Sequence, residues 1–271
     1  MPSRSRPRIA FASVLIAGLA RGGDEPRPDV ATAPGFEAFL VIPLRVHVLR
    51  SAALPEVDCG LKDEDVRRVV GKVNRIWHAA GIHWALDPIV REAAAREADF
   101  RAARAEGEGE ALGEVQLLAP EGSRSARGMD VYYVHRFAAN GVFLGDRMAF
   151  IQETAQLLPV EGGGDEPLPR VTAHELAHAL GLPHRQSSTN LLASGTTGTL
   201  LSTGEAERAR AAAIEIPGVL AVPDLRKRAF EAAKAKDLPG ARRLWRTLAE
   251  IPGAGAAEAR SELRALGGAK P

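Results

Sequence analysis

The chain has 271 residues, of which 45% are hydrophobic and 25% charged, a composition that predicts a globular protein of one or two domains and excludes disorder throughout. Basic residues number 35 and acidic residues 34, so no basic excess is present to neutralise phosphates, and we expect no nucleic-acid partner. The single cysteine, Cys59, excludes an internal disulfide and a cysteine cluster. A metal site would therefore have to use histidine and carboxylate ligands.

The N-terminus has the pattern of a secretory signal peptide over residues 1–20. Three arginines and no acidic residue precede an apolar run at residues 9–20, which ends in small side chains. A spanning helix needs about 20 apolar residues, so this run is too short for one, and we expect no membrane span in the mature chain. The sequence predicts an exported protein, secreted or periplasmic, in which residues 21–39 form a flexible leader.

The next part of the chain predicts a strand, a helix and a second strand. Residues 39–49 are rich in β-branched side chains and predict the first strand. Residues 63–80 place apolar side chains at helical spacing and stop at Gly81. Residues 82–86 predict the second strand, and a crossover of this kind favours parallel strands in one sheet.

An insertion and two further strands are expected before the active-site region. Residues 91–127 consist mainly of Ala, Arg, Glu and Gly, and predict an insertion with a helix over 92–105 and no functional site. Residues 129–134 and 141–151 predict strands, which would complete a four-stranded mixed sheet. After a loop, residues 170–180 predict a helix.

The C-terminal part, residues 216–271, predicts a helical tail. Three Ala-rich helical patterns cover residues 225–236, 239–251 and 256–266. They resemble a tetratricopeptide-type helical hairpin, but only about one repeat is present, and at least three are usually needed for independent stability. We expect the tail to pack on the preceding domain, residues 40–215. The alternative is that it docks a protein partner.

One eleven-residue run carries most of the chemical information. His174 and His178 are four residues apart, so on a helix their imidazoles share one face. Glu175 falls at the margin of that face, where it can reach a water molecule without acting as a ligand. Gly181 can end the helix in the left-handed conformation, so that the chain reverses and brings His184 back as a third ligand.

Three neutral imidazoles with a free fourth position favour Zn²⁺, although the sequence leaves another divalent ion open. Bound zinc acidifies water and polarises a carbonyl group, which suits amide hydrolysis. An alternative interpretation of the carboxylate is structural, because Thr172 and Glu175 have the spacing of a helix capping box.

The run resembles the signature of the metzincin zinc metallopeptidases, H-E-x-x-H-x-x-G-x-x-H, at all five signature positions. The resemblance implies that His174, His178 and His184 bind zinc and that Glu175 is the general base, which then protonates the leaving amine. In the family a turn containing methionine lies beneath the metal, and here Leu192 takes the place of that methionine, where it can fill the same apolar volume.

The resemblance covers about residues 40–215 and implies an α+β fold. The expected domain has a mixed, mostly parallel twisted sheet and two long helices, followed by a C-terminal helical hairpin. In metzincins an antiparallel edge strand lies above the cleft and pairs with the extended substrate, and residues 141–151 are the segment most similar to it. The alternative is a plain edge strand. Arg185, next to the third ligand position, matches no common subfamily.

Several other residues have chemical potential but weak patterns. Cys59 predicts an inert, partly buried thiol rather than the blocking cysteine of latent metzincins. Asp165 and Glu166 could hold a structural Ca²⁺, although a solvated loop is the default interpretation. Four histidines lack a partner at ligand spacing and predict packing or surface roles: His47, His78, His83 and His135.

Together these patterns predict an exported zinc endopeptidase that hydrolyses internal peptide bonds of a protein or peptide substrate. The alternative is a catalytically silent zinc-binding domain used for docking or adhesion. The carboxylate of Glu175 argues against that alternative, because a silent site has no need of a general base. A third hypothesis is an amidase or peptidase that acts on cell-wall peptides.

Overall fold

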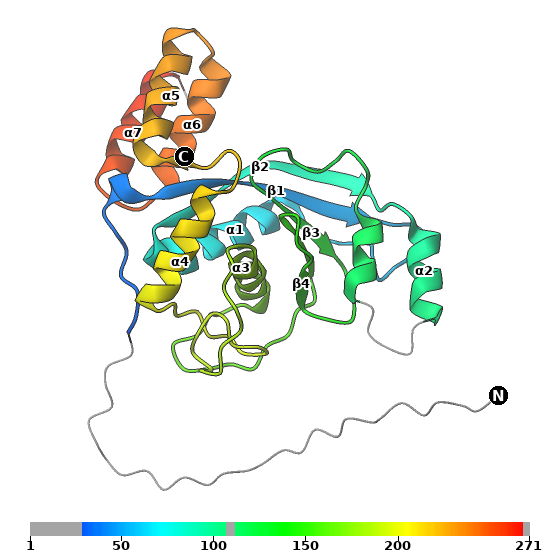
Figure 1. Cartoon of the computed structure of the whole chain (residues 1–271). Coiled ribbons are helices and arrows are strands. Elements are labelled where there is room, and N and C mark those ends of the chain that lie inside the picture. Colours follow the sequence, from blue (N-terminus) through cyan, green and yellow to red (C-terminus); the bar gives the residue numbers. More distant parts are fainter. Residues whose placement is uncertain (1–28, 107–111, 268–271) are drawn as a thin grey trace, which may run out of the picture.

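The computed structural model describes residues 29–106 and 112–267, so the expected signal peptide lies outside the described residues. A six-stranded sheet forms the centre of the molecule (Figure 1). Its order is β2-β1-β3-β5-β4, with β6 pairing to the start of β1. The strands are β1 (Leu40–Arg50), β2 (Ile82–Ala93), β3 (Met129–Val134), β4 (Gly141–Phe143), β5 (Met148–Gln152) and β6 (Leu220–Ala221).

The sheet is mixed and mostly parallel, as the sequence predicts. β1 runs parallel to both β2 and β3, and β5 runs parallel to β3, whereas β4 and β6 are antiparallel to their neighbours. The predicted strand over 141–151 is in fact a hairpin of β4 and β5. Its turn contains Gly145, Asp146 and Arg147, all with positive φ angles, and these reverse the chain.

The second strand is longer than the sequence predicts. β2 pairs with β1 from Ile82 to Ala93. The prediction of a helix over 92–105 was therefore wrong for its first residues, which belong to the strand or precede the helix. The pairing partner explains the difference, because β1 continues to Arg50 and can satisfy the backbone of β2 over that length. Helix α2 (Glu97–Glu106) and the 3₁₀ helix η3 (Leu112–Leu118) follow it.

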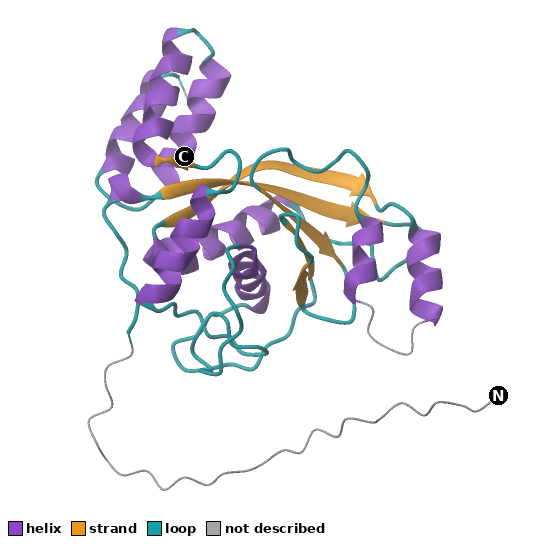
Figure 2. Ribbon diagram, viewed as in Figure 1, coloured by secondary structure: helices purple, strands orange, loops and turns teal. Residues whose placement is uncertain are grey.

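Helices cover both faces of the sheet (Figures 1 and 2). Alternate residues of β1 such as Leu44 and Val46 face a core formed with three helices. The opposite face of β1 contributes to two smaller clusters, one at Val41 with the C-terminal helices and one at Leu49 with α2 and η3. The three core helices are α1 (Asp63–Trp77), α3 (Pro167–Ala179) and α4 (Thr203–Ile214), of which α4 was not predicted.

The tail folds as three helices that pack on the first strand. They are α5 (Val222–Lys234), α6 (Leu238–Glu250) and α7 (Gly255–Ala265), close to the predicted segments. Buried Trp245 and Leu248 lie in one cluster with Phe39 and Val41 of the sheet region. The tail therefore shares a core with the domain, in agreement with the expected packing role.

Residues 29–38, part of the expected leader, lie against the body of the protein. Ala31 is buried, and its N–H donates to the carbonyl of Leu201. Thr203 donates its hydroxyl hydrogen to Asp29 at 2.7 Å, which joins this segment to the start of α4. None of the helices within the described ranges is long and apolar enough to cross a membrane.

Candidate metal centre

The first two histidines of the motif lie one turn apart on helix α3. This helix begins at Pro167, earlier than predicted, because proline at the first helical position has no N–H to lose. After Ala179 the chain turns at Gly181, whose φ of 73° is left-handed. The N–H of Leu182 then donates to the carbonyl of Ala177, which closes the helix end and directs the chain back toward the histidines.

The three histidines converge as the spacing predicts. Their Nε2 atoms form a triangle, with 3.0 Å between His174 and His178, 3.1 Å between His178 and His184, and 3.2 Å between His184 and His174. Tetrahedral Zn–N bonds of about 2.0–2.1 Å require nitrogen atoms about 3.3 Å apart, so the triangle is close to the size of such a site. The three imidazoles are therefore positioned to hold a metal ion.

Backbone carbonyls fix the orientation of the two helical imidazoles. His174 Nδ1 donates to Leu191 O at 2.8 Å, and His178 Nδ1 donates to Leu182 O at 2.8 Å. With the proton on Nδ1, each Nε2 carries the lone pair that a metal needs. Burial lowers the pKa of His174 to about 3 and lowers that of His178 as well, so both rings are neutral at physiological pH.

The side of the cluster nearest His184 is open to water. His174 is buried, His178 is intermediate and His184 is exposed. A metal ion held by the three nitrogens would therefore have protein on one side and solvent on the other. That arrangement leaves room for a fourth ligand from solution, which distinguishes a catalytic site from a closed structural one.

The carboxylate of Glu175 lies between helix α3 and the edge strand β4. A Cβ atom at Gly141 would stand 2.7 Å from Glu175 Cγ and 2.8 Å from its Oε1, so only glycine fits at that position. Glu175 is 6% exposed. Burial raises the pKa of Glu175 to about 7, against the opposing effects of the Phe143 backbone and of Arg170.

The alternative capping role of Thr172 and Glu175 was wrong. Helix α3 already has its N-cap at Glu166, so Thr172 is inside the helix rather than at its start. Its hydroxyl group donates to Leu168 O at 2.8 Å and is 2.9 Å from the hydroxyl of Tyr133. Glu175 is therefore free of a capping function.

The turn that contains Leu192 lies beside the first histidine, since Leu191 supplies the carbonyl that accepts from His174. The side chain of Leu192 is fully buried in the main core. Arg170, also buried, donates to the carbonyls of Leu191 at 2.8 Å and Gly198 at 3.1 Å, and it also bonds Ala193. This arginine fixes the turn to the helix that carries the histidines.

Glu205 of helix α4 holds the same loop from the other side. It accepts from Arg185 Nε at 2.6 Å and from Asn190 Nδ2 at 2.9 Å. Arg185 directly follows His184, and its backbone N–H donates to Leu192 O at 3.0 Å. Sequence reasoning assigned no role to Arg170 or Glu205, because their partners are backbone groups and side chains from a loop that has no periodic pattern.

The remaining histidines lie elsewhere, as predicted. His47 and His83 are buried, and neither belongs to the metal cluster. His135 Nδ1 is 2.7 Å from Glu153 Oε1. The prediction of an inert Cys59 agrees with the structure, in which the side chain is fully buried. Burial raises the pKa of Cys59 to about 12, so its reactive thiolate form is suppressed.

The two acids considered for calcium are engaged by basic side chains. Lys72 Nζ lies 2.6 Å from Asp165 and 3.0 Å from Glu166, and Arg68 also pairs with Glu166. The basic side chains of Lys72 and Arg68 thus occupy the positions next to these carboxylates that a calcium ion would need. Within the described ranges, the three-histidine cluster is the one group of three or more potential metal ligands whose donor atoms all lie within 4.8 Å of one another.

Neither a protein-family model nor a curated protein matches the sequence. The fold and the site therefore define the class: an α+β domain with a mostly parallel open sheet and a three-histidine cluster suited to a metal ion.

Proposed function

We propose that the protein is an exported zinc-dependent endopeptidase of the metzincin type. The observation that carries this proposal is the Nε2 triangle of His174, His178 and His184, with the buried carboxylate of Glu175 on the next residue of the same helix. Three histidine nitrogens with an open side are a ligand set of catalytic zinc. When bound, zinc would polarise the scissile carbonyl group and acidify a water molecule.

Glu175 is the group proposed to move the proton. A carboxyl group with a pKa of about 7 can accept a proton from water and release it again near neutral pH. In peptide hydrolysis it would take the proton from the attacking water and then give it to the leaving amine. Burial against Gly141 holds the carboxylate in one place and excludes bulk water from it.

The proposed binding site for the peptide is the edge strand β4. It pairs with β5 on one side, and among the described residues no strand pairs with its other side. An extended peptide could add to that free edge by backbone hydrogen bonds. Because Gly141 of this strand contacts Glu175, a peptide bound there would pass beside the carboxylate.

The test is the substitution Glu175→Gln, with Glu231→Gln, an exposed site in the tail, as the matched control. We expect one zinc per chain in both variants by elemental analysis. Hydrolysis of a mixed peptide library should fall by about 10²- to 10⁴-fold in Glu175→Gln alone. Loss of zinc from Glu175→Gln, or unchanged hydrolysis, would contradict the assigned role.

The same samples separate the competing hypotheses. Stoichiometric zinc with no hydrolysis of any substrate by the unsubstituted protein would support the silent docking domain. Cleavage of cell-wall peptides but not of ordinary peptides would support the amidase. Internal cleavage of ordinary peptides that stops with a chelator and returns with zinc is the result expected of an endopeptidase.

A further inference from the structure

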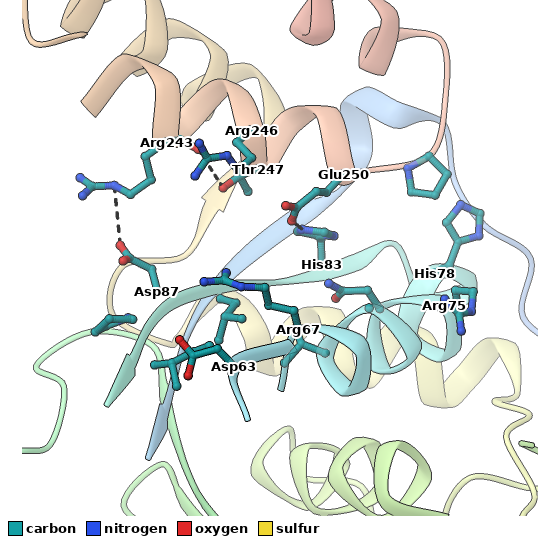
Figure 3. Close-up of a pocket in the computed structure, with 17 residues that line it drawn as sticks. Asp63, Arg67, Arg75, His78, His83, Asp87, Arg243, Arg246, Thr247 and Glu250 are labelled. Carbon is teal, nitrogen blue, oxygen red and sulfur yellow. Dashed lines mark hydrogen bonds and ion pairs between the residues drawn. The ribbon is translucent and has the colours of Figure 1, made fainter. Parts of the chain in front are cut away.

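A large cavity lies at the edge of the sheet opposite the one beside the metal centre. It is lined by residues of α1, β2 and α6, so it occupies the place where the tail meets the domain (Figure 3). β2 forms one edge of the sheet, and β4, beside Glu175, forms the other. The cavity has a volume of about 950 Å³. Pockets that bind small ligands commonly have about 300–1,000 Å³.

Arginines from two helices line this cavity. Arg67 and Arg75 come from α1, and Arg243 and Arg246 come from α6 (Figure 3). Arg243 Nε lies 3.6 Å from a carboxylate oxygen of Asp87. The other three arginines form no ion pair with any residue that the structure describes. Guanidinium groups without a partner are suited to bind a carboxylate through two hydrogen bonds.

A buried imidazole supplies an independent sign of a ligand. His83 lines the cavity and is 2% exposed. Its Nε2 has no hydrogen-bond partner among the described residues and is 3.7 Å from the Glu250 carboxylate, beyond hydrogen-bond range. A buried polar atom normally has a partner, so an additional polar group is expected in the cavity.

The rest of the lining restricts the class of that group. Val70, Leu86 and Ile89 add apolar surface, which suits a ligand with apolar side chains. Asp63 and Asp87 also line the cavity, but each pairs with an arginine, Arg91 and Arg243 respectively. Glu250 is then the one lining acid without an arginine partner among the described residues, so the three arginines without an ion pair outnumber it. Pro88 lies on β2 and has no N–H to donate, so recognition by addition of a strand is disfavoured at this edge.

We propose that this pocket binds a short acidic peptide segment, with its carboxylates on Arg67 and Arg246 and its apolar side chains on the α1–β2 surface. The pocket would then be a docking site for a protein partner or substrate, separate from the metal centre. The proposal does not depend on the peptidase function, because none of the lining residues belongs to the metal cluster.

The probe for this pocket is a fluorescent acetylated pentapeptide, Leu-Glu-Leu-Glu-Leu, and its counterpart with Gln in place of Glu. Binding is measured by fluorescence anisotropy to the full chain carrying Glu175→Gln, which prevents cleavage. We expect the acidic peptide to bind about tenfold more tightly than its counterpart, and Arg67→Gln with Arg246→Gln to remove that advantage. Glu250→Gln, which removes a competing carboxylate, should tighten binding.

Exposed arginines outside the pocket provide the control pair, Arg208→Gln with Arg264→Gln. This pair removes the same charge and should change the affinity by less than about twofold. Equal weakening by both pairs would mean nonspecific attraction and would overturn the proposal. Failure of the acidic peptide to bind would also overturn it, as would displacement of the peptide by inorganic phosphate at equal concentration, which would indicate a small-anion site.

Discussion

His174 of the motif and His47 are both buried, and they differ in where their ring nitrogens point. In the motif, His174 and His178 donate through Nδ1 to backbone carbonyls, and their Nε2 atoms face another imidazole. His47, on β1, has Nδ1 2.6 Å from Glu92 and Nε2 3.0 Å from Asp130. Both nitrogens of His47 therefore face carboxylates.

The difference shows how a metal-binding histidine can be told from a structural one. A ligand needs a nitrogen lone pair directed at a shared point, and neutral backbone carbonyls leave that lone pair free. At His47 each ring nitrogen instead faces its own carboxylate, so neither nitrogen is directed at a point shared with another imidazole. Burial alone does not distinguish the two kinds of histidine, since His47 and His174 are both buried.

The largest expected effect follows from removal of one ligand. His178→Ala takes away one corner of the nitrogen triangle, and two histidines do not make a stable zinc site in competition with water. We expect loss of bound zinc and of hydrolysis. Removal of a group that only hydrogen-bonds a metal ligand lowers metal affinity or activity by about 10- to 100-fold, and loss of the ligand itself should have a larger effect. Elemental analysis after dialysis measures it, with His135→Ala as the control that keeps its zinc.

The second prediction concerns His47. His47→Leu would leave the carboxylate of Asp130, which is 1% exposed, without its imidazole partner and with the N–H of Ser125 as its remaining hydrogen-bond donor among the described residues. Removing one member of a buried pair costs about 3–5 kcal/mol, so we expect a loss of that size in the free energy of unfolding in urea. The zinc content of the folded protein should not change.

The control for this variant is His135→Leu. His135 also pairs with a carboxylate, but its side chain is 43% exposed. An exposed pair contributes about 0–1 kcal/mol, so the loss should be small. Equal destabilisation by the two variants would contradict the distinction between a buried and an exposed histidine pair, and loss of zinc from His47→Leu would contradict its purely structural role.

A third prediction uses the pH dependence of the metal-free protein. The pKa of Glu175 is raised to about 7 from an ordinary 4.5, so its stabilising contribution is complete below pH 4.5 and is lost as the pH rises through 7. Metal-free Glu175→Gln should therefore be more stable than the metal-free parent at pH 8, by up to about 3 kcal/mol, and the gap should close at pH 4. Thermal or urea unfolding at both pH values measures it.

The comparison of parent and variant cancels the opposite effect of the histidines, which both proteins share. The pKa values of His174 and His178 are lowered, so their contribution is present above pH 6.5 and is lost as the pH falls. A gap of the same size at pH 4 and pH 8 would mean that Glu175 is not buried as the structure has it.

The sequence predicted those parts of the site that depend on local spacing. His174 and His178 share a helix face because they are four residues apart, and Gly181 ends the helix because glycine accepts a positive φ. Arg170 and Glu205 could not be found in this way. Their roles depend on carbonyls and side chains of the loop at residues 185–198, which come near only once the chain has folded.

The fold shows the same limit. The β-α-β unit was predictable from its periodicity, whereas the length of β2 depends on its pairing with β1 as far as Arg50. The turn of the β4–β5 hairpin was missed because the apolar residues on both sides of Gly145 and Asp146 were interpreted as one strand, although both residues favour turns. Long-range pairing, by contrast, is what sequence patterns do not encode locally.

The smallest expected effect concerns the turn beneath the first histidine. Leu192 is fully buried, while the backbone bonds of Leu191 and Arg185 hold the turn in place. Leu192→Met conserves volume, so we expect a change below about 1.5 kcal/mol in unfolding free energy. Because the histidines are oriented by backbone carbonyls rather than by this side chain, zinc affinity should change less than about tenfold.

Leu201→Met, in the same core but outside the turn, is the control. A large gain in zinc affinity or hydrolysis for Leu192→Met alone would show that the side chain tunes the site directly, and that the backbone bonds do not suffice to set the geometry of the imidazoles.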